Sequence, residues 1–345
     1  LFTIDEETGM TGAKGLQAGF LTGKTLLNLD TEDDDELTIG CAGGLDVVGQ
    51  GHYSQEDVSP DASHNWLIVK GLAGGHSGMD IHKGRANANK VMNRLLYLAN
   101  RELPSLQIIS IDGGGLRNAI PRESKALIAV AKSQREGLEN LLNSHQSVLR
   151  AEFKSTDPGL TLELQPVDAI TNKCLPATFQ KSLLDGLYSL PHGIYRLSPE
   201  VAGLVQTSNN LARVLVCDGH FSVQCLCRSA ICSEKEDMAR AISASLESFG
   251  AQVRWEGAYP GWAPLPNSDI VKLMSGLYRE MFHQEPHVKA CHAGLECGII
   301  GSNYPQMEMI SFGPNIRGAH SPDECVQISS VSKFWDFLLK TLSRL

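Results

Sequence analysis

The sequence contains no long apolar run and no excess of basic residues. No apolar run approaches the roughly 20 residues that a membrane-spanning helix needs, so we expect no membrane partner. Lysine and arginine number 30 against 39 aspartate and glutamate residues, and the net charge of −9 argues against a nucleic-acid partner. Aromatic residues make up only 6% of the chain, whereas hydrophobic residues reach 42% and there are 33 glycines. This composition predicts a globular protein with many tight turns.

The cysteines lack the spacing of a zinc motif or of a disulfide framework. There are nine, an odd number, and no two are separated by two other residues. Structural zinc sites commonly use such closely spaced pairs, and disulfide frameworks use even numbers of cysteines. We therefore expect reduced thiols and a cytoplasmic location.

The sequence also lacks an initial methionine and opens on an apolar run, residues 1–4, which reads as a strand. Domains seldom begin inside a strand, so we expect a fragment or a processed chain, whose targeting signals are not readable. A second apolar run at 25–29, with a helix in 12–22 between the two, predicts a β–α–β unit with parallel strands. Acidic residues follow both runs, at the sheet edge where α/β proteins bind ligands.

The middle of the chain, residues 44–259, has a different pattern of alternating strands and amphipathic helices. Asp218-Gly219 between two strand-like runs predicts a tight hairpin, and the helices are expected on one face of the sheet. Helices are expected at 86–99, 178–190, 268–282 and 330–344. Two further helices are expected directly after capping boxes, one formed by Ser133 and Glu136 and one by Ser233 and Glu236.

The end of the chain resembles its beginning more than its middle. We therefore predict an α/β domain made of residues 1–43 and 260–345, into which an α+β domain of residues 44–259 is inserted. The length of 345 residues is sufficient for two hydrophobic cores.

Two acidic segments are candidates for metal chemistry. Glu6 and Glu7 are adjacent, so one carboxylate can bind a metal while the other faces a metal-bound water as a general base. An exposed acidic turn is the alternative, and for an isolated pair it is the more common case. Asp30 follows a strand and opens the acidic run 30–36, which lacks the spacing of a calcium loop. We expect the rest of that run to be solvated surface.

Two histidines and one arginine are further candidates. His320 lies in a Gly/Pro-containing loop after a strand, which suits a zinc ligand, and a surface histidine is the alternative. His76 lies among three glycines, which suits an electrophile or an oxyanion donor, and a plain glycine-rich turn is the alternative. Arg228 ends an alternating strand on its open face, where it can clamp a carboxylate, and a surface arginine is the alternative.

Several segments, taken together and in order, resemble a known family. They are residues 3–10, 28–32, 40–44, 70–78, 114–123, 257–262, 292–298 and 313–324. They are similar to the aminoacylase/carboxypeptidase family of two-zinc peptidases, and within it to the bacterial aminoacyl-histidine dipeptidase branch. The resemblance implies an α/β catalytic domain with an inserted α+β lid domain, through which a homodimer can form.

The resemblance also implies a role for each candidate residue. Glu6 is implied as the general base, and His76 as the residue that stabilises the oxyanion, in many relatives that of the partner subunit. The implied cofactors are two zinc ions, or other divalent metals such as cobalt or manganese, and the implied substrates are unblocked dipeptides, Xaa-His among them. The implied zinc ligands are Glu7, Asp30 and His320, and the implied substrate-binding residues are Asn118, Arg228 and Gly294.

One part of the family pattern is missing from this sequence. The family also has a His-x-Asp segment and a bridging Asp before an Asn-Gly, both upstream of the Glu-Glu pair. None of the eleven histidines is followed by Asp two positions on, and no Asp-Asn-Gly occurs. We therefore expect an incomplete catalytic domain that binds zinc poorly and turns over little as given. The alternatives are a catalytically incomplete dimerisation or binding module and an amidohydrolase acting on N-acyl amino acids.

Overall fold

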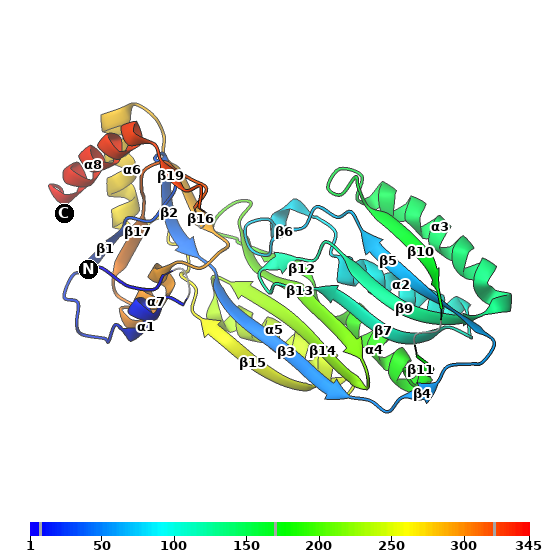
Figure 1. Ribbon diagram of the computed structural model, residues 1–345. Coiled ribbons are helices and arrows are strands. Elements are labelled where there is room, and N and C mark those ends of the chain that lie inside the picture. Colours follow the sequence, from blue (N-terminus) through cyan, green and yellow to red (C-terminus); the bar gives the residue numbers. More distant parts are fainter. Residues whose placement is uncertain (7–8, 169–170, 320–321) are drawn as a thin grey trace.

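The computed structural model has two parts that lie side by side, each built on its own main sheet (Figure 1). It describes residues 1–6, 9–168, 171–319 and 322–345. Glu7 and His320, two of the expected metal ligands, lie outside the described residues. Among the described helices, none combines the length and the hydropathy that crossing a membrane requires.

The smaller part is a four-stranded sheet with helices on both faces. β1 is parallel to β17 and β16 is parallel to β2, while β17 and β2 are antiparallel. Alternate strand residues face different helices: Ile310 packs with α6 and α8, and Met309 lies on the side of α7. In order, the strands are β1 (Thr25–Asn28), β17 (Glu308–Ser311), β2 (Glu36–Cys41) and β16 (His287–Cys291), and the helices are α1 (Thr11–Gly15), α6 (Asp269–Phe282), α7 (Glu296–Asn303) and α8 (Ile328–Leu342).

The larger part is a sheet of nine strands, and all neighbouring strands in it are antiparallel. β12 (Gly193–Leu197) pairs with β13 beside the main path. Along that path the order is β10 (Thr161–Val167), β5 (Ala62–Lys70), β9 (Ser124–Ala131), β7 (Gln107–Gly114), β13 (Val205–Cys217), β14 (His220–Ser229), β3 (Gly43–His52) and β15 (Gln252–Tyr259).

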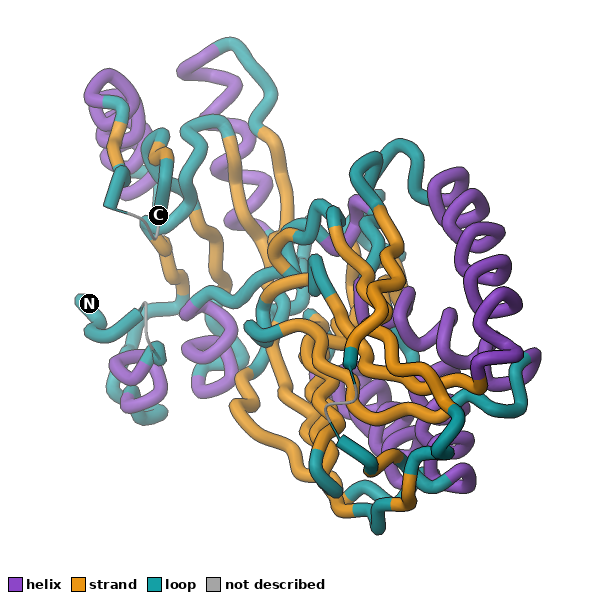
Figure 2. Tube along the Cα trace, turned by 45° about the vertical axis from the view of Figure 1, so that its right-hand side comes forward, coloured by secondary structure: helices purple, strands orange, loops and turns teal. Residues whose placement is uncertain are grey.

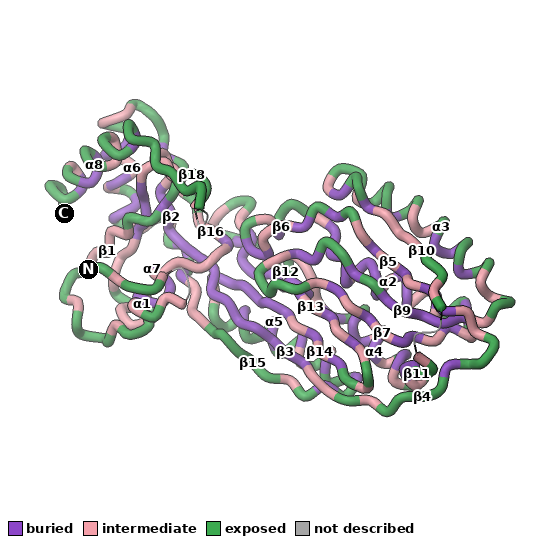
Figure 3. Tube along the Cα trace, viewed as in Figure 1, coloured by how far each residue is buried: buried purple, intermediate pink, exposed green. Residues whose placement is uncertain are grey.

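Four helices cover one face of the nine-stranded sheet, as expected from the sequence (Figure 2). Their apolar residues join alternate residues of the strands, such as Val47, Val69 and Ile128, in a single core. Burying each such side chain contributes about 1.5–3 kcal/mol, and the buried residues follow the strands in Figure 3. The helices are α2 (Ala88–Glu102), α3 (Arg135–Glu152), α4 (Ala177–Ser189) and α5 (Cys232–Glu247).

The other face of this sheet is partly covered by the short strand pair β4 (Glu56–Asp57) and β11 (Lys173–Cys174), next to a cluster around Leu127. A further short pair, β6 (Gly75–His76) and β8 (Ala119–Ile120), joins two loops that are more than 40 residues apart in the chain. The pair β18 (Ile316–Arg317) and β19 (Cys325–Val326) belongs to the smaller part.

The hairpin expected at Asp218-Gly219 is confirmed, whereas both expected capping boxes are wrong. Asp218 and Gly219 have φ angles of 50° and 77°, the left-handed pair that a two-residue hairpin turn requires. Ser133 lies in the 3-10 turn η2 (Lys132–Gln134), which runs directly into α3. Within the described residues, neither the start of α3 nor that of α5 has a side-chain cap. Neither serine stands at the N-cap, because α3 begins at Arg135 after the 3-10 turn and α5 already begins at Cys232.

The strand expected at residues 1–4 is not present, and neither is the β–α–β unit. Phe2 is fully exposed, and no described strand lies beside this segment. An extended segment becomes a strand only when a neighbour takes up its hydrogen bonds. Here the carbonyl of Ile4 accepts from the amide of Gly12 at 3.1 Å, so the chain turns back on itself. The parallel neighbour of β1 is instead β17.

Candidate active site at the junction of the two sheets

The loop of residues 292–295, between β16 and α7, lies where the two parts of the structure meet. The amide of Ala42, between β2 and β3, donates to the carbonyls of Cys291 and Ala293 at 3.2 and 3.0 Å. From this loop, His292 contacts the larger part, because its Nε2 is 2.7 Å from the hydroxyl of Ser208 on β13. Glu296, just after the loop, accepts a hydrogen bond from Thr3 Oγ1 at 2.6 Å. Residues 292–296 therefore link the segment around Glu6 to the strands of the larger sheet.

Arg228 lies near the end of β14, beside this loop, and is buried. Arg228 projects from the face of β14 that the alternation of the sequence predicted. That face was expected to be open there, but Arg228 is only 4% exposed. Its NH1 donates to the phenol oxygen of Tyr259 at 3.1 Å, and its Nε has no partner among the described residues. Leaving a buried charged donor unpaired is costly, and a carboxylate would satisfy it through two parallel hydrogen bonds. The geometry therefore suits an anionic ligand group at Arg228.

The ring of Tyr259 is held between two glycines. A Cβ added to Gly294 would lie 2.9 Å from the ring, and one added to Gly44 would overlap it. Both glycines therefore permit the close approach that brings the phenol to Arg228. The sequence reasoning singled out Gly294 but missed Tyr259, although it lies in the 257–262 segment that carries part of the resemblance.

His76 lies on β6, in a turn that packs against Arg228. A Cβ on Gly78 would lie 3.1 Å from Arg228 Nε and would overlap the carbonyl of His292. Nδ1 of His76 accepts hydrogen bonds from the amides of Gly78 and Met79 at 3.2 and 2.9 Å. Since Nδ1 is an acceptor, the neutral ring carries its proton on Nε2. The turn therefore fixes the tautomer that donates from Nε2.

Asn118 is brought next to the His76 turn by the pairing of β6 with β8. Its carbonyl accepts from the amide of Ser77 at 2.7 Å, and its side chain is exposed. The amide group of Asn210 supports the same loop by donating to the carbonyls of Arg117 and Ala119 at 3.3 and 2.8 Å. His76 and Asn118 therefore belong to one small double-loop structure.

Two ionisable residues that the sequence reasoning missed complete the surroundings of Arg228. Asp46 on β3 is 6% exposed and pairs with Arg117; burial raises its pKa, against the effect of the positive charges of Arg117 and Arg228. Burial, with a smaller contribution from the charge of Arg228, lowers the pKa of His292 to about 3, so its ring is neutral. Both were missed because their roles arise only from contacts between distant segments.

Glu6 and Asp30 lie in the smaller part. Glu6 is half-buried in the turn after Ile4, and Asp30 is exposed just beyond β1. Since β1 and β17 are parallel, Asp30 lies at the same sheet edge as the segment 312–319 that follows β17 and leads toward residue 320. Among the described residues, no three His, Cys, Asp or Glu side chains are gathered as a metal site.

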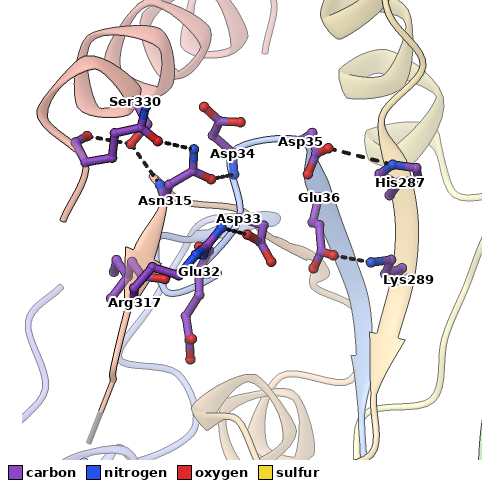
Figure 4. Close-up of polar contacts among 12 residues, drawn as sticks. Glu32, Asp33, Asp34, Asp35, Glu36, His287, Lys289, Asn315, Arg317 and Ser330 are labelled. Atoms are coloured by element: carbon purple, nitrogen blue, oxygen red, sulfur yellow. Dashed lines mark hydrogen bonds and ion pairs between the residues drawn. The ribbon is translucent and has the colours of Figure 1, made fainter. Parts of the chain in front are cut away.

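The acidic run after Asp30 lies mostly at the surface, as expected from its sequence, but several of its residues also pair with distant segments (Figure 4). Asp33 pairs with Arg317 at 2.7 Å, and the amide of Asp34 donates to Asn315 Oδ1 at 2.8 Å. Asp35 lies 3.7 Å from His287, and Glu36 pairs with Lys289. The run therefore fastens the segment 312–319 and β16 to the start of β2.

Comparison with known proteins identifies the family. A family model described as a peptidase dimerisation domain, of the M20 type, matches residues 67–157. The chain is 40% identical over its 345 residues to the cytosol non-specific dipeptidase of Escherichia coli K12, and the match spans 71% of that relative. The chain belongs to the M20 family of peptidases, in the cytosol non-specific dipeptidase branch. The crystal structure of aminoacylhistidine dipeptidase from Vibrio alginolyticus matches 99% of this chain and 70% of that protein, with a TM-score of 0.95 and 38% identity.

The M20 membership and the mixed α/β fold expected from the sequence are thereby confirmed. Within this M20 chain, four of the expected site residues lie around Tyr259, the 292–296 loop and the adjoining His76 turn, and Glu6 is joined to the same loop through Thr3. Asp30 is close enough for its charge to raise the pKa of Cys291 and Cys297, on either side of the loop, although burial is the main cause in both. The four residues are His76, Asn118, Arg228 and Gly294.

Proposed function

We propose that this chain provides substrate-binding and catalytic groups for the hydrolysis of unblocked dipeptides, Xaa-His among them. The observation that carries the proposal is the buried guanidinium of Arg228, whose Nε has no described partner and which lies against Tyr259 and the His76 turn. The dipeptidase relatives from E. coli and V. alginolyticus support the same substrate class.

In this proposal Arg228 binds the C-terminal carboxylate of the dipeptide. Its Nε and a neighbouring nitrogen form the planar fork that matches a carboxylate, and its burial strengthens the pairing. The exposed side chain of Asn118, on the loop beside His76, contributes an amide to the same end of the substrate. Gly294 leaves room beside Tyr259, because any side chain there would press on the ring.

His76 and Glu6 are the proposed catalytic residues. With its proton on Nε2, His76 donates a hydrogen bond to the oxygen that becomes negative when the peptide carbonyl is attacked. Glu6 takes a proton from the attacking water and returns it to the leaving amine. The hydrogen bond between Thr3 and Glu296 holds the segment of Glu6 next to the loop shared with Arg228.

The proposed metal ligands are Glu7, Asp30 and His320. Carboxylate and imidazole donors are those that zinc takes, and cobalt and manganese accept them as well. Asp30 is the member of this set that the structure describes, and its exposed position beyond β1 fits a ligand at the sheet edge. A bound metal ion would supply an activated water and polarise the carbonyl.

We also propose that the protein forms a homodimer through the lid domain, residues 44–259, which contains the segment 67–157. The support is the match of this segment to a model described as a peptidase dimerisation domain. The segment 67–157 contains β7, β9, α2 and α3 and includes the His76 turn. The proposed homodimer and the candidate active site therefore share part of the same domain.

Hydrolysis of a matched substrate set tests the function. Because these 345 residues contain no His-x-Asp segment, the purified protein with zinc added is expected to cleave Ala-His only slowly, to cleave neither N-acetyl-Ala-His nor Ala-His amide, and to lose the slow activity with a chelator. Arg228→Gln is expected to abolish calorimetric binding of Ala-His, whereas Arg240→Gln, which changes an exposed arginine of α5 paired with Glu236, keeps it.

The other outcomes distinguish the alternatives. Cleavage of the N-acetylated compound would favour an N-acyl amidohydrolase over a dipeptidase. Binding without any cleavage would favour a binding module, the alternative supported by the lack of a His-x-Asp segment in these 345 residues.

A further inference from the structure

A cavity of about 490 Å³ opens at the start of α2. Its walls come from the segment 81–87 before α2, from the first part of α2, from the end of α3 and from residues 188–194, between the end of α4 and the start of β12. They include the apolar side chains of Val91, Leu149, Phe153 and Ile194. Small-molecule sites typically have volumes of about 300–1,000 Å³ and mostly apolar walls with a few polar groups. The cavity therefore has the size and lining of a ligand site.

The charged residues that line this cavity are all basic. They are Arg85, Lys90 and Arg94, and no Asp or Glu is among the lining residues, although the whole chain has a net charge of −9. His192 also lines the cavity, and burial lowers its pKa to about 4, so it adds no charge at neutral pH. The lining is therefore basic, although Arg94 and Arg85 each have a carboxylate partner outside the cavity, Glu152 and Asp80.

The charged groups of two of the three basic residues already have several hydrogen-bond acceptors within the protein. Arg94 binds both carboxylate oxygens of Glu152, at 2.7 and 2.9 Å. The ammonium of Lys90 donates to three carbonyls at the end of α4, at 2.8, 3.0 and 3.1 Å. Arg85 uses NH1 for the carbonyl of Gly74 at 2.5 Å, and within the described chain its Nε and NH2 have no acceptor. Arg85 is therefore the group that can bind an anion.

We propose that this cavity binds an anionic small molecule with an apolar body, such as a carboxylate on an alkyl or aromatic group, and that Arg85 links its occupancy to the His76 turn. The apolar body lies against the walls and the anion pairs with the free edge of the Arg85 guanidinium. The link to catalysis rests on the proposed function, whereas the binding does not.

The contacts of Arg85 supply the link. NH1 of Arg85 lies between the carbonyl of Gly74 and the carboxylate of Asp80, at 2.5 and 3.6 Å. The same oxygen of Asp80 accepts from the amide of His76 at 2.8 Å. Gly75 has φ 137°, and a Cβ there would overlap Arg85 NH1 and lie 2.5 Å from Asp80 Oδ2. Arg85 and Asp80 are therefore in direct contact with the backbone of residues 74–76, which positions His76.

Binding is tested with octanoate and 1-octanol, which share a tail and differ in charge, in competition with the fluorescent anion 8-anilinonaphthalene-1-sulfonate. Octanoate is expected to bind one per chain and about tenfold more tightly than octanol. Arg85→Gln should remove that preference and Arg85→Lys should keep part of it, while Arg101→Gln, at the far end of α2, should leave it unchanged. Equal affinities for the two probes, or no effect of Arg85→Gln in a folded variant, overturns the site.

The link is tested by amide hydrogen exchange at residues 76–79. Saturating octanoate is expected to slow exchange of the His76, Gly78 and Met79 amides, whose hydrogen bonds define the turn. It should have no effect on these amides in Arg85→Gln. Unchanged exchange in the wild type with octanoate bound overturns the link. Neither measurement uses hydrolysis, so both are independent of whether the proposed dipeptidase activity is found.

Discussion

Arg228 and Tyr259 form a buried pair in which NH1 of the guanidinium donates to the phenol oxygen at 3.1 Å. The two residues are adjacent only because β14 and β15 both pair with β3, which places Arg228 and Tyr259 on opposite sides of Gly44. With a glycine at that position, the phenol ring can lie against the strand and reach the arginine. The pair thus joins the proposed substrate-binding residue Arg228 to the end of β15, from which the chain continues into the smaller part.

Removing the phenol oxygen is expected to weaken substrate binding more than catalysis. In Tyr259→Phe the ring keeps its packing, but Arg228 loses the acceptor that orients its guanidinium. We expect KM for Ala-His to rise about tenfold, with kcat changed less than about twofold. Steady-state kinetics measures both, and Tyr195→Phe, which alters an exposed tyrosine on β12, is the control. A loss in kcat alone would contradict the orienting role.

A methyl group at Gly294 should displace the Tyr259 ring. Its Cβ would lie 2.9 Å from the ring, so the loop or the ring must move. We expect Gly294→Ala to lower the free energy of unfolding by about 1–3 kcal/mol and to weaken binding of Ala-His. Urea denaturation and calorimetry measure the two effects.

Gly276→Ala is the matched control for Gly294→Ala. Gly276 lies within α6, and nothing is within 4 Å of its added Cβ. Because alanine has the higher helix propensity, this variant should be more stable by up to about 1 kcal/mol. If both substitutions behaved alike, the contact between Gly294 and Tyr259 would not be the cause.

Local patterns in the sequence were sufficient to predict most helices and strands of the larger part. The β13–β14 hairpin is an example, because the two left-handed residues of its turn are neighbours in the chain. Residues 1–4 have the composition of a strand, yet whether they form one depends on a partner elsewhere in the fold. The acidic run 30–36 has the composition of a solvated surface, but Arg317, His287 and Lys289 come from distant segments to pair with it.

For the candidate site, too, features set by neighbouring residues were predicted and features set by distant segments were not. His76 and Arg228 were found because a glycine-rich turn and the end of an alternating strand are local signals. Asp46 and His292 were missed, because an aspartate in a strand and a histidine in a loop have no pattern that distinguishes them from surface residues. Their importance comes from burial beside Arg228, which depends on how β3, β14 and the 292–296 loop pack.

The proposed role of Asp30 predicts a measurable loss of zinc binding. Asp30→Asn removes a negatively charged oxygen ligand, so the apparent zinc affinity should fall more than about tenfold, however weak it is in the parent chain. Competition with a chromophoric chelator measures this. Asp35→Asn, in the same acidic run but beside His287, should leave the affinity unchanged. Equal losses in the two variants would point to general electrostatics and not to a ligand.

Burial of His292 predicts that stability falls in mild acid. Its pKa is lowered to about 3 in the folded protein, against an ordinary value of 6.5, so between these values the unfolded chain binds the extra proton. Above pH 6.5 this group therefore costs no stability. As the pH falls from 6.5 toward 3, the free energy of unfolding declines, and the loss from this group is about 2 kcal/mol at pH 5.

Urea denaturation at a series of pH values measures this dependence. His292→Gln has no titrating group at this position and can still hydrogen-bond to Ser208, so its stability should fall less steeply between pH 7 and 5 than that of the parent chain. His287→Gln, which changes an exposed histidine on β16, should keep the parent slope. Parallel slopes for the parent and His292→Gln would show that the ring of His292 is not the buried neutral group that the packing against Ser208 and Arg228 requires.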